Sequence, residues 1–228
     1  MTLPHRPESG RTGIGAWLRG LFSRSTRGSG GDPAFQPYRL LARQLLADLP
    51  CAEGGRVLFV ASVTDLPTDT LLTIAYFLRD ELGSRLLLAD TTGRPDGVGA
   101  WVGAPGRAGF LDLVHDAKKR LVDIAQPTVR TGIAVLNTGR PLSDGVAAMQ
   151  ASQVERVLEE ARRTYDYTLV QLPAILDDPG FLRFVSLADT ILLVVAEGRI
   201  GLEDLARARA LLDSQGAPSV RMVLCGSE

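Results

Sequence analysis

Hydrophobic and polar positions along the chain fall into two alternating patterns. Short apolar runs rich in Val, Ile and Leu are typical of buried strands, and stretches with apolar residues at helical spacing are typical of amphipathic helices. The apolar runs predict strands at 56–60, 85–90, 133–137, 167–173, 190–195 and 220–225. The helical spacing predicts helices at 35–49, 71–78, 110–117, 147–163, 181–187 and 202–215. Strands that alternate with helices predict an α/β fold with a doubly wound, mainly parallel sheet flanked by helices.

The chain divides into a tail and one domain. Residues 1–34 are rich in Gly, Ser, Pro and Arg, which predicts a disordered N-terminal tail, and residues 35–228 are predicted to form the α/β domain. Within the tail, Trp17, Leu18 and Leu21 share one helical face among several arginines. This amphipathic segment suggests folding on a protein partner or contact with a membrane surface. Its glycines disfavour a helix, so a tail that binds nothing is the alternative.

Composition narrows the functional classes. A formal net charge of −1 gives no electrostatic case for nucleic acid as a partner. No apolar run approaches the roughly 20 residues that span a bilayer, and the N-terminus lacks the apolar core of a secretory signal. We therefore expect a cytoplasmic protein, with peripheral contact at the inner membrane as a second hypothesis. Two cysteines are expected to be reduced, and two histidines cannot build a histidine-rich metal site, so we predict no metal centre.

The stretch 56–78 organises the candidate chemistry. A buried strand leads through the loop 62–70 into a helix, which is the place where a phosphate-binding loop sits. Such a loop needs glycines for close backbone approach to phosphates and a lysine to pair with them. This loop has neither, and it contains two aspartates. Asp90 ends the next predicted strand, and the carboxyl ends of parallel strands are where such folds bind ligands. The alternative is that Asp90 caps a turn.

Motifs along the chain resemble a known family in their order and spacing. The segment 86–95 contains a predicted strand that ends in Asp90. The segment 165–176 begins with Tyr-Asp-Tyr and continues as an apolar strand, and the segment 187–195 begins with Leu-Ala-Asp and continues in the same way. Shorter matches lie at 110–113 and 134–139. From about residue 35 to 226 the chain resembles the tyrosine autokinases of bacterial exopolysaccharide systems (CpsD/CapB-like), in the MinD/ParA-like branch of P-loop ATPases. The resemblance implies a P-loop fold with an ATP and Mg²⁺ site.

The departures from the family fall on the nucleotide site. Leu66 and Thr68 stand where the family has glycines, Asp69 stands where it has the lysine, and Thr70 keeps the position that holds Mg²⁺. Asp69 in place of lysine turns an attraction to phosphate into a repulsion. One unit charge at about 4 Å contributes roughly 4 kcal/mol at an effective dielectric near 20, so the change weakens binding more than a thousandfold.

The second half of the site departs in the same direction. Asp90 and Arg94 match the family, whereas Thr92 replaces a second aspartate and Gln171 stands where a metal-associated aspartate is usual. A neutral glutamine cannot supply the charge that a bound Mg²⁺ needs. We therefore predict a catalytically inactive, pseudokinase-like protein with degenerate Walker motifs and no cofactor. The vestigial site positions are Asp69, Thr70, Asp90, Arg94 and Gln171.

The resemblance also implies a role and a partner. A cytoplasmic scaffold or regulator of exopolysaccharide biosynthesis would dock on a membrane-embedded chain-length regulator or export component. The docking candidates are Trp17, Leu18, Leu21, Tyr38, Arg39 and Arg43. The last three lie where the family has a Glu-x-x-Arg-x-x-Arg ring-assembly motif, but the glutamate is missing and one arginine is displaced, so oligomerisation is left open.

Two other readings of the sequence stay open. In the first, the chain is a working ATPase or autokinase with an unorthodox loop, uses ATP and Mg²⁺, and relies on Thr70, Asp90 and either Arg94 or Arg107. In the second, it is a ParA-like partitioning protein, which needs a nucleotide switch and meets the same objection at Asp69.

Overall fold

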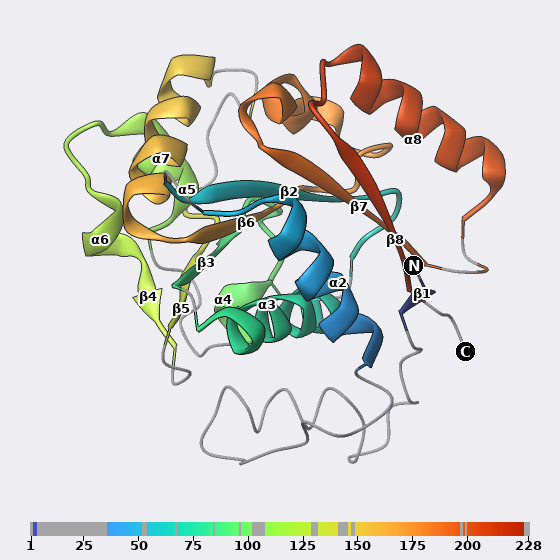
Figure 1. Cartoon of the computed structure of the whole chain (residues 1–228). Coiled ribbons are helices and arrows are strands. Elements are labelled where there is room, and N and C mark those ends of the chain that lie inside the picture. The colour runs from blue at the N-terminus through green and yellow to red at the C-terminus, as the bar shows by residue number, and fades with distance from the viewer. Residues whose placement is uncertain are drawn as a thin grey trace.

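One mainly parallel sheet of eight strands forms the centre of the computed structural model (Figure 1). The structure describes residues 2–3, 36–51, 54–66, 68–83, 85–95, 97–101, 108–128, 132–140, 146, 149–196, 198 and 200–225. The strands are β1 (Thr2–Leu3), β2 (Arg56–Ser62), β3 (Leu86–Asp90), β4 (Gln126–Pro127), β5 (Ile133–Leu136), β6 (Tyr167–Gln171), β7 (Thr190–Ala196) and β8 (Val220–Cys225). Their order is β1-β8-β7-β2-β6-β3-β5-β4, and every pairing is parallel except that of β4 with β5.

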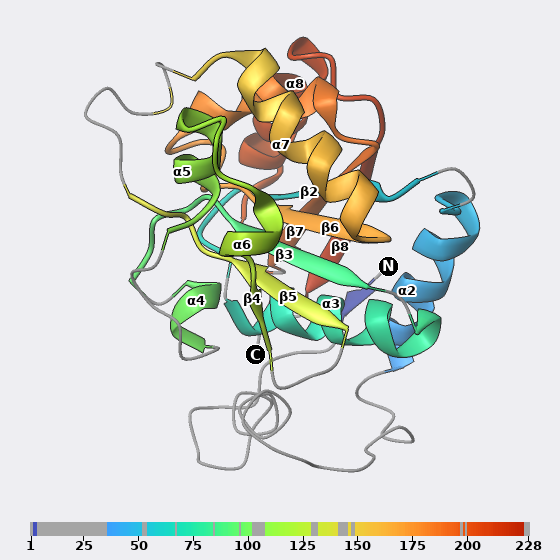
Figure 2. The same ribbon diagram turned by 90° about the vertical axis from the view of Figure 1, so that its left-hand side faces the viewer.

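Helices cover both faces of the sheet and enclose two apolar cores (Figure 2). One face carries α2 (Gln36–Asp48), α3 (Thr68–Leu82) and α4 (Val98–Trp101). The other carries α5 (Phe110–His115), α6 (Leu121–Ile124), α7 (Ala151–Thr164), the 3₁₀ helix η3 (Pro179–Leu187) and α8 (Leu202–Ser214). The predicted doubly wound α/β fold is confirmed, because parallel strands with helices on both faces are its defining arrangement.

The central strands form where the sequence has continuous apolar runs. The residues of β3 and β6 are buried along their whole length, and so are Val57–Ser62 of β2. A strand covered by helices on both faces has no polar side, so its side chains do not alternate. Helix α3 ends at Leu82, and Gly83 follows with φ of +63°, the left-handed conformation that commonly closes a helix.

Several short elements depart from the predictions. Thr2–Leu3 lie in the segment predicted to be disordered, yet they pair with Leu224 and Cys225 at the edge of the sheet. The rest of that segment lies outside the described residues. Helix α6 and strand β4 were not predicted. The segment predicted as a helix at 181–187 is a 3₁₀ helix, whose start is capped by the Asp178 carboxylate. Within the described residues, no helix is both long and apolar enough to cross a membrane.

Candidate functional site

Asp90 and Gln171 lie side by side at the carboxyl edge of the sheet. The register pairs Asp90 of β3 with Gln171 of β6, and Gln171 with Val60 of β2 on its other side. Asp90 is 3 % exposed and Gln171 is 2 % exposed. Side chains alternate along a strand, so both face the core under α3, as Leu88 and Leu169 do two residues earlier. The strand order therefore places these two candidate residues next to each other.

The loop after β3 is held by its own hydrogen bonds. Asp90 Oδ1 accepts from both the backbone N–H and the hydroxyl of Thr92, each at 2.8 Å. The Thr91 hydroxyl donates to the Gln171 carbonyl oxygen at 2.6 Å, and the Gly93 N–H donates to the Thr138 hydroxyl at 3.0 Å. Asp90 therefore caps a turn, which is the structural role that the sequence left open for it.

The described side chains of the loop after β2 contact the core or another loop of the chain. Leu66 is 6 % exposed and packs into the core beneath α3, where a glycine would leave the backbone open. Asp65 instead forms an ion pair with Arg94 of the neighbouring loop. Thr68 and Thr70 begin α3, and Asp69 lies between them in its first turn. The side chain of Asp69 lies outside the described part of the structure.

Three observations on the described residues bear on whether this end of the sheet could hold ATP with Mg²⁺. Arg94, which could meet a phosphate, already contacts a carboxylate of its own chain. Gln171 Oε1 is buried without a hydrogen-bond partner, and a neutral amide oxygen supplies no charge to a metal. Among the residues that the structure describes, no group of three or more His, Cys, Asp or Glu is placed to hold a metal ion. Among the described residues, the polar groups at this end of the sheet thus bond largely to one another.

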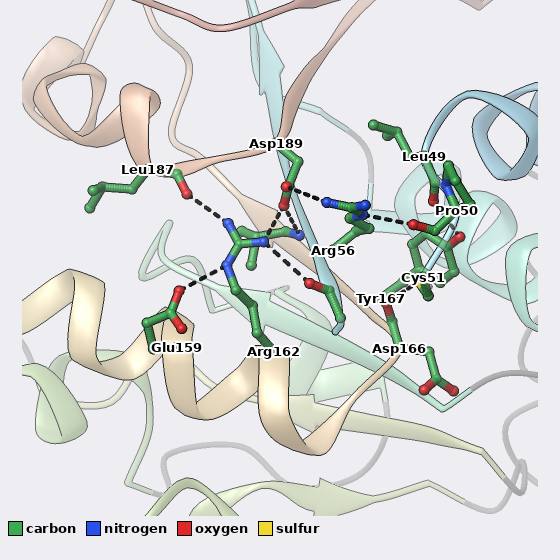
Figure 3. A network of polar contacts seen from close by, with 12 residues as sticks. Leu49, Pro50, Cys51, Arg56, Glu159, Arg162, Asp166, Tyr167, Leu187 and Asp189 are labelled. Carbon is green, nitrogen blue, oxygen red and sulfur yellow. Dashed lines mark hydrogen bonds and ion pairs between the residues drawn. The ribbon is translucent and has the colours of Figure 1, made fainter. Parts of the chain in front are cut away.

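A second polar network centres on Asp189 and lies at the amino-terminal ends of strands β2 and β7 (Figure 3). Asp189 Oδ2 accepts from the Val57 N–H at 2.7 Å and forms a close ion pair with Arg162. Arg56 Nη1 lies 3.3 Å from Asp189 Oδ1. Arg162 also donates to the Leu187 carbonyl oxygen at 3.0 Å. The network ties α7, β2 and β7 together. Sequence reasoning did not predict it, although the Leu-Ala-Asp motif at 187–189 was its signal.

The neighbouring Tyr-Asp-Tyr motif is structural too. The Asp166 carboxylate accepts from the Arg85 N–H at 2.7 Å, and the Cys51 thiol donates to the Asp166 carbonyl oxygen at 2.9 Å. The Tyr167 hydroxyl donates to the Leu49 carbonyl oxygen at 2.8 Å. Burial raises the pKa of Cys51, and burial together with the adjacent thiol raises the pKa of Tyr167. Both groups stay protonated at neutral pH, so neither is a ready nucleophile.

The docking candidates of α2 contact α3 within the chain. Tyr38 is 4 % exposed and its ring stacks on that of Phe77, with 6.0 Å between ring centroids. Arg39 and Arg43 both form ion pairs with Glu81, at 3.3 and 2.8 Å. Arg43 is the more accessible of the two, with 66 % of its side chain exposed against 18 % for Arg39. Docking through these residues stays a prediction. Trp17, Leu18 and Leu21 lie outside the described residues.

The chain is similar to known proteins in its structure. No protein-family model matches the chain, and no curated protein matches it in sequence. The kinase domain of Escherichia coli tyrosine kinase ETK superposes with a TM-score of 0.80 at 18 % identity, over 99 % of this chain and 89 % of that one. The BceF tyrosine kinase domain gives 0.74 at 19 % identity, over 87 % and 79 %.

A more distant similarity extends beyond kinases. The MinD cell division protein of Aquifex aeolicus superposes with a TM-score of 0.59 at 23 % identity, over 75 % of this chain and 68 % of that one. Both groups of structures thus share the overall fold of this chain. The chain therefore has the fold of bacterial tyrosine kinase domains, within the wider MinD/ParA-like P-loop architecture.

Proposed function

We propose that the chain is a catalytically silent relative of the bacterial tyrosine kinase domains that acts as a scaffold or regulator. The observation that carries the proposal is the Arg94–Asp65 ion pair, which directs the matched arginine of the nucleotide site to a carboxylate of the same chain. Buried Leu66 and the neutral Gln171 support it, because both replace groups that a bound nucleotide needs. The fold is kept while the nucleotide chemistry is lost.

The motif resemblance suggests where such a scaffold works. Tyrosine autokinases with these motifs belong to exopolysaccharide systems, so we propose a cytoplasmic role in exopolysaccharide biosynthesis and export. The partner is a membrane-embedded chain-length regulator or export component, reached through the segment around Trp17 and Leu21 or through the exposed part of α2. Fold likeness alone does not assign a function, so this pathway is tested separately from the loss of catalysis.

Calorimetry tests the loss of nucleotide binding. Titration of the whole chain with ATP and Mg²⁺ up to millimolar concentration is expected to give no saturable heat. Saturable binding in the micromolar range would overturn the proposal. The matched variant is Asp69→Lys, which restores the family's charge at that position and is expected to strengthen binding by roughly a thousandfold if electrostatics is the cause.

A second function, a working ATPase or autokinase, is favoured by one observation. Asp90 keeps a buried position at the carboxyl end of β3, paired with Gln171 of β6. The variant Thr70→Ala with Asp90→Asn alters two of the three positions that match the family, Thr70, Asp90 and Arg94, while keeping an oxygen that can accept from Thr92. In a strain that lacks the gene, this variant should restore the secreted polysaccharide as well as the wild-type gene does. Failure to restore it, with normal protein levels, would support the enzyme instead.

A further inference from the structure

We infer that the outer edge of β8, at residues 220–223, docks an extended segment of another protein in which an acidic residue lies opposite Arg221 between two apolar residues. The mode of docking is strand addition, in which backbone hydrogen bonds join the segment to the sheet and alternate side chains give selectivity. The inference goes beyond the proposed function, since it depends neither on the loss of nucleotide chemistry nor on a pathway.

The backbone of β8 offers hydrogen-bonding groups on the side that faces away from β7. Ile191 of β7 is the register partner of Val220, and its N–H donates to the Ser219 carbonyl oxygen at 2.7 Å. In a parallel ladder, a residue bonds to the two residues that flank its register partner. Arg221 therefore directs its backbone groups to β7, as Ser219 does its carbonyl, whereas the N–H and C=O groups of Val220 and Met222 point outward.

Strand β1 shows what kind of segment this edge accepts. The two residues of β1 run parallel to β8 and pair with Leu224 and Cys225. Within the described part of the chain, no strand pairs with residues 220–223 on the same side of β8, and Met222 is 42 % exposed. An unpaired stretch of edge is a template for a further strand. We expect that strand to lie in line with β1 and to run in the same direction.

Arg221 determines the charge that the open stretch prefers. Its Nη1 atom lies 2.6 Å from Asp48 Oδ2 of α2, and 36 % of its side chain is exposed. Its Nε atom is buried and has no hydrogen-bond acceptor among the residues that the structure describes. A buried donor without an acceptor is unfavourable, and a guanidinium has enough N–H groups to contact a second carboxylate. An acidic residue opposite Arg221, on the same face of the sheet, is therefore favoured.

The residues beside Arg221 favour apolar neighbours. Side chains alternate along a strand, so Val220 and Met222 lie on the other face, where Val220 packs against the core that α8 covers. Apolar residues opposite these two would cover the exposed part of Met222. A second copy of β8 fits less well. Antiparallel pairing of Val220 with Met222 of the other copy would set the two Arg221 side chains opposite each other, and like charges in that position are unfavourable.

Nuclear magnetic resonance of the whole chain tests the docking with two synthetic peptides, Thr-Val-Glu-Val-Thr and Thr-Val-Lys-Val-Thr, at constant ionic strength. The glutamate peptide should give saturable shifts of the Val220 and Met222 amide signals and slow their hydrogen exchange. The lysine peptide should bind at least about threefold more weakly. The control Arg221→Gln should bind both peptides equally. No saturable shift at these amides, or equal binding of both peptides by wild type, would overturn the inference.

Hydrogen exchange of the protein without peptide decides between occupants. We expect the Val220 and Met222 amides to exchange fast. Protection that grows with protein concentration would assign the edge to a second copy, and protection at all concentrations would assign it to another part of the same chain. Either result would overturn the inference. The variant Met222→Pro removes an outward N–H and none that β7 uses, so it should abolish binding of the glutamate peptide.

A tethered strand covers the case in which the proline variant does not fold. Val-Glu-Val joined directly before Met1 continues the register of β1 and places its glutamate opposite Arg221. This extension should raise the melting temperature by roughly 2–4 °C, and a Val-Lys-Val extension should raise it less. Equal melting temperatures for the two extended proteins would contradict the inference. The proposed function is tested separately by ATP titration, so failure of one does not imply failure of the other.

Discussion

The carboxylate of Asp189 accepts a hydrogen bond from the backbone N–H of Val57, with 2.7 Å between Oδ2 and the nitrogen. The Asp189 N–H in turn donates to the Val57 carbonyl oxygen at 2.8 Å. The side chain and the backbone of Asp189 thus hold the first residues of β2 beside the start of β7. Arg162 of α7 joins the same carboxylate, so one aspartate aligns three elements.

Replacement of Asp189 by alanine should destabilise the fold. The change removes the carboxylate that the Val57 N–H and the Arg162 guanidinium share in a largely buried place, so the free energy of unfolding should fall by about 3 kcal/mol. Urea denaturation measures the loss. The control is Asp213→Ala, which breaks an exposed ion pair with Arg209 on α8 and should change stability by less than about 1 kcal/mol. Similar losses for both variants would show that the Asp189 network stabilises the fold no more than an exposed ion pair does.

Replacement of Gly55 by alanine should be costly for a steric reason. A Cβ at this position would lie 2.0 Å from the Tyr165 carbonyl oxygen and 2.8 Å from that of Arg162, both of which belong to the backbone. The expected loss is about 2 kcal/mol or more in the free energy of unfolding. Gly201→Ala is the matched control, because its nearest atom would be 3.9 Å away and its φ is −70°. A melting temperature unchanged by Gly55→Ala would contradict the packing described here.

The contribution of Asp112 should depend on pH. Burial opposes its ionisation, but hydrogen bonds from the Gly109 and Arg140 N–H groups and the charge of Lys119 lower the pKa of Asp112 below its ordinary 3.8. A lowered pKa in the folded state means that the ionised form stabilises the fold above pH 3.8, and that this stabilisation is lost as the pH falls through the folded-state pKa.

The variant Asp112→Asn isolates that contribution. At pH 7 its free energy of unfolding should be about 1–2 kcal/mol below that of wild type, because the carboxylate makes charge-assisted hydrogen bonds. The difference between the two proteins should shrink as the pH is lowered from 5 towards 2. Denaturant unfolding at several pH values measures it, and a difference that stays constant across this range would refute the assignment.

Tyr38 and Arg43 should respond differently to truncation. Tyr38→Ala removes a buried ring that packs on Phe77, so we expect a loss of about 3 kcal/mol in the free energy of unfolding. Arg43→Ala removes an exposed side chain and should leave stability nearly unchanged. Arg43 is thus the cleaner probe of docking: a partner that uses α2 should bind this variant more weakly, whereas unchanged binding would argue against that use.

The central fold could be predicted because burial leaves a plain signal in the sequence. Strands β2, β3, β6 and β7 are covered on both faces, so their apolar runs are continuous. Short elements gave no such signal. Strand β1 has two residues and forms only because β8 offers an edge, and α6 has four residues whose first N–H, that of Leu121, is accepted by the distant Glu160. Such contacts depend on the finished fold, which local pattern does not encode.

The candidate site, too, could be predicted only in part from the sequence. Asp90 was a site candidate because parallel strands end on one side of the sheet, which the pattern indicates. Its adjacency to Gln171 depends on the order of the strands, which the pattern does not indicate. The pairing of Asp65 with Arg94 depends on two loops whose paths the sequence does not determine. The motifs at 165–167 and 187–189 carried the resemblance, and the structure gives their aspartates structural contacts in Asp166 and Asp189. These motifs therefore mark contacts that hold the fold together.

Strand β4 limits the association of this sheet with strands of other molecules. It is two residues long, runs antiparallel to β5 and ends in Pro127, which has no N–H to offer a further strand. The edge formed by β4 therefore offers few backbone hydrogen-bonding groups to a strand of another molecule, which disfavours fibrils and edge-to-edge dimers. At the other margin the described residues of β1 pair with Leu224 and Cys225 of β8, and Met222 of β8 is 42 % exposed. Any partner that joins the sheet by adding a strand should therefore do so along β8.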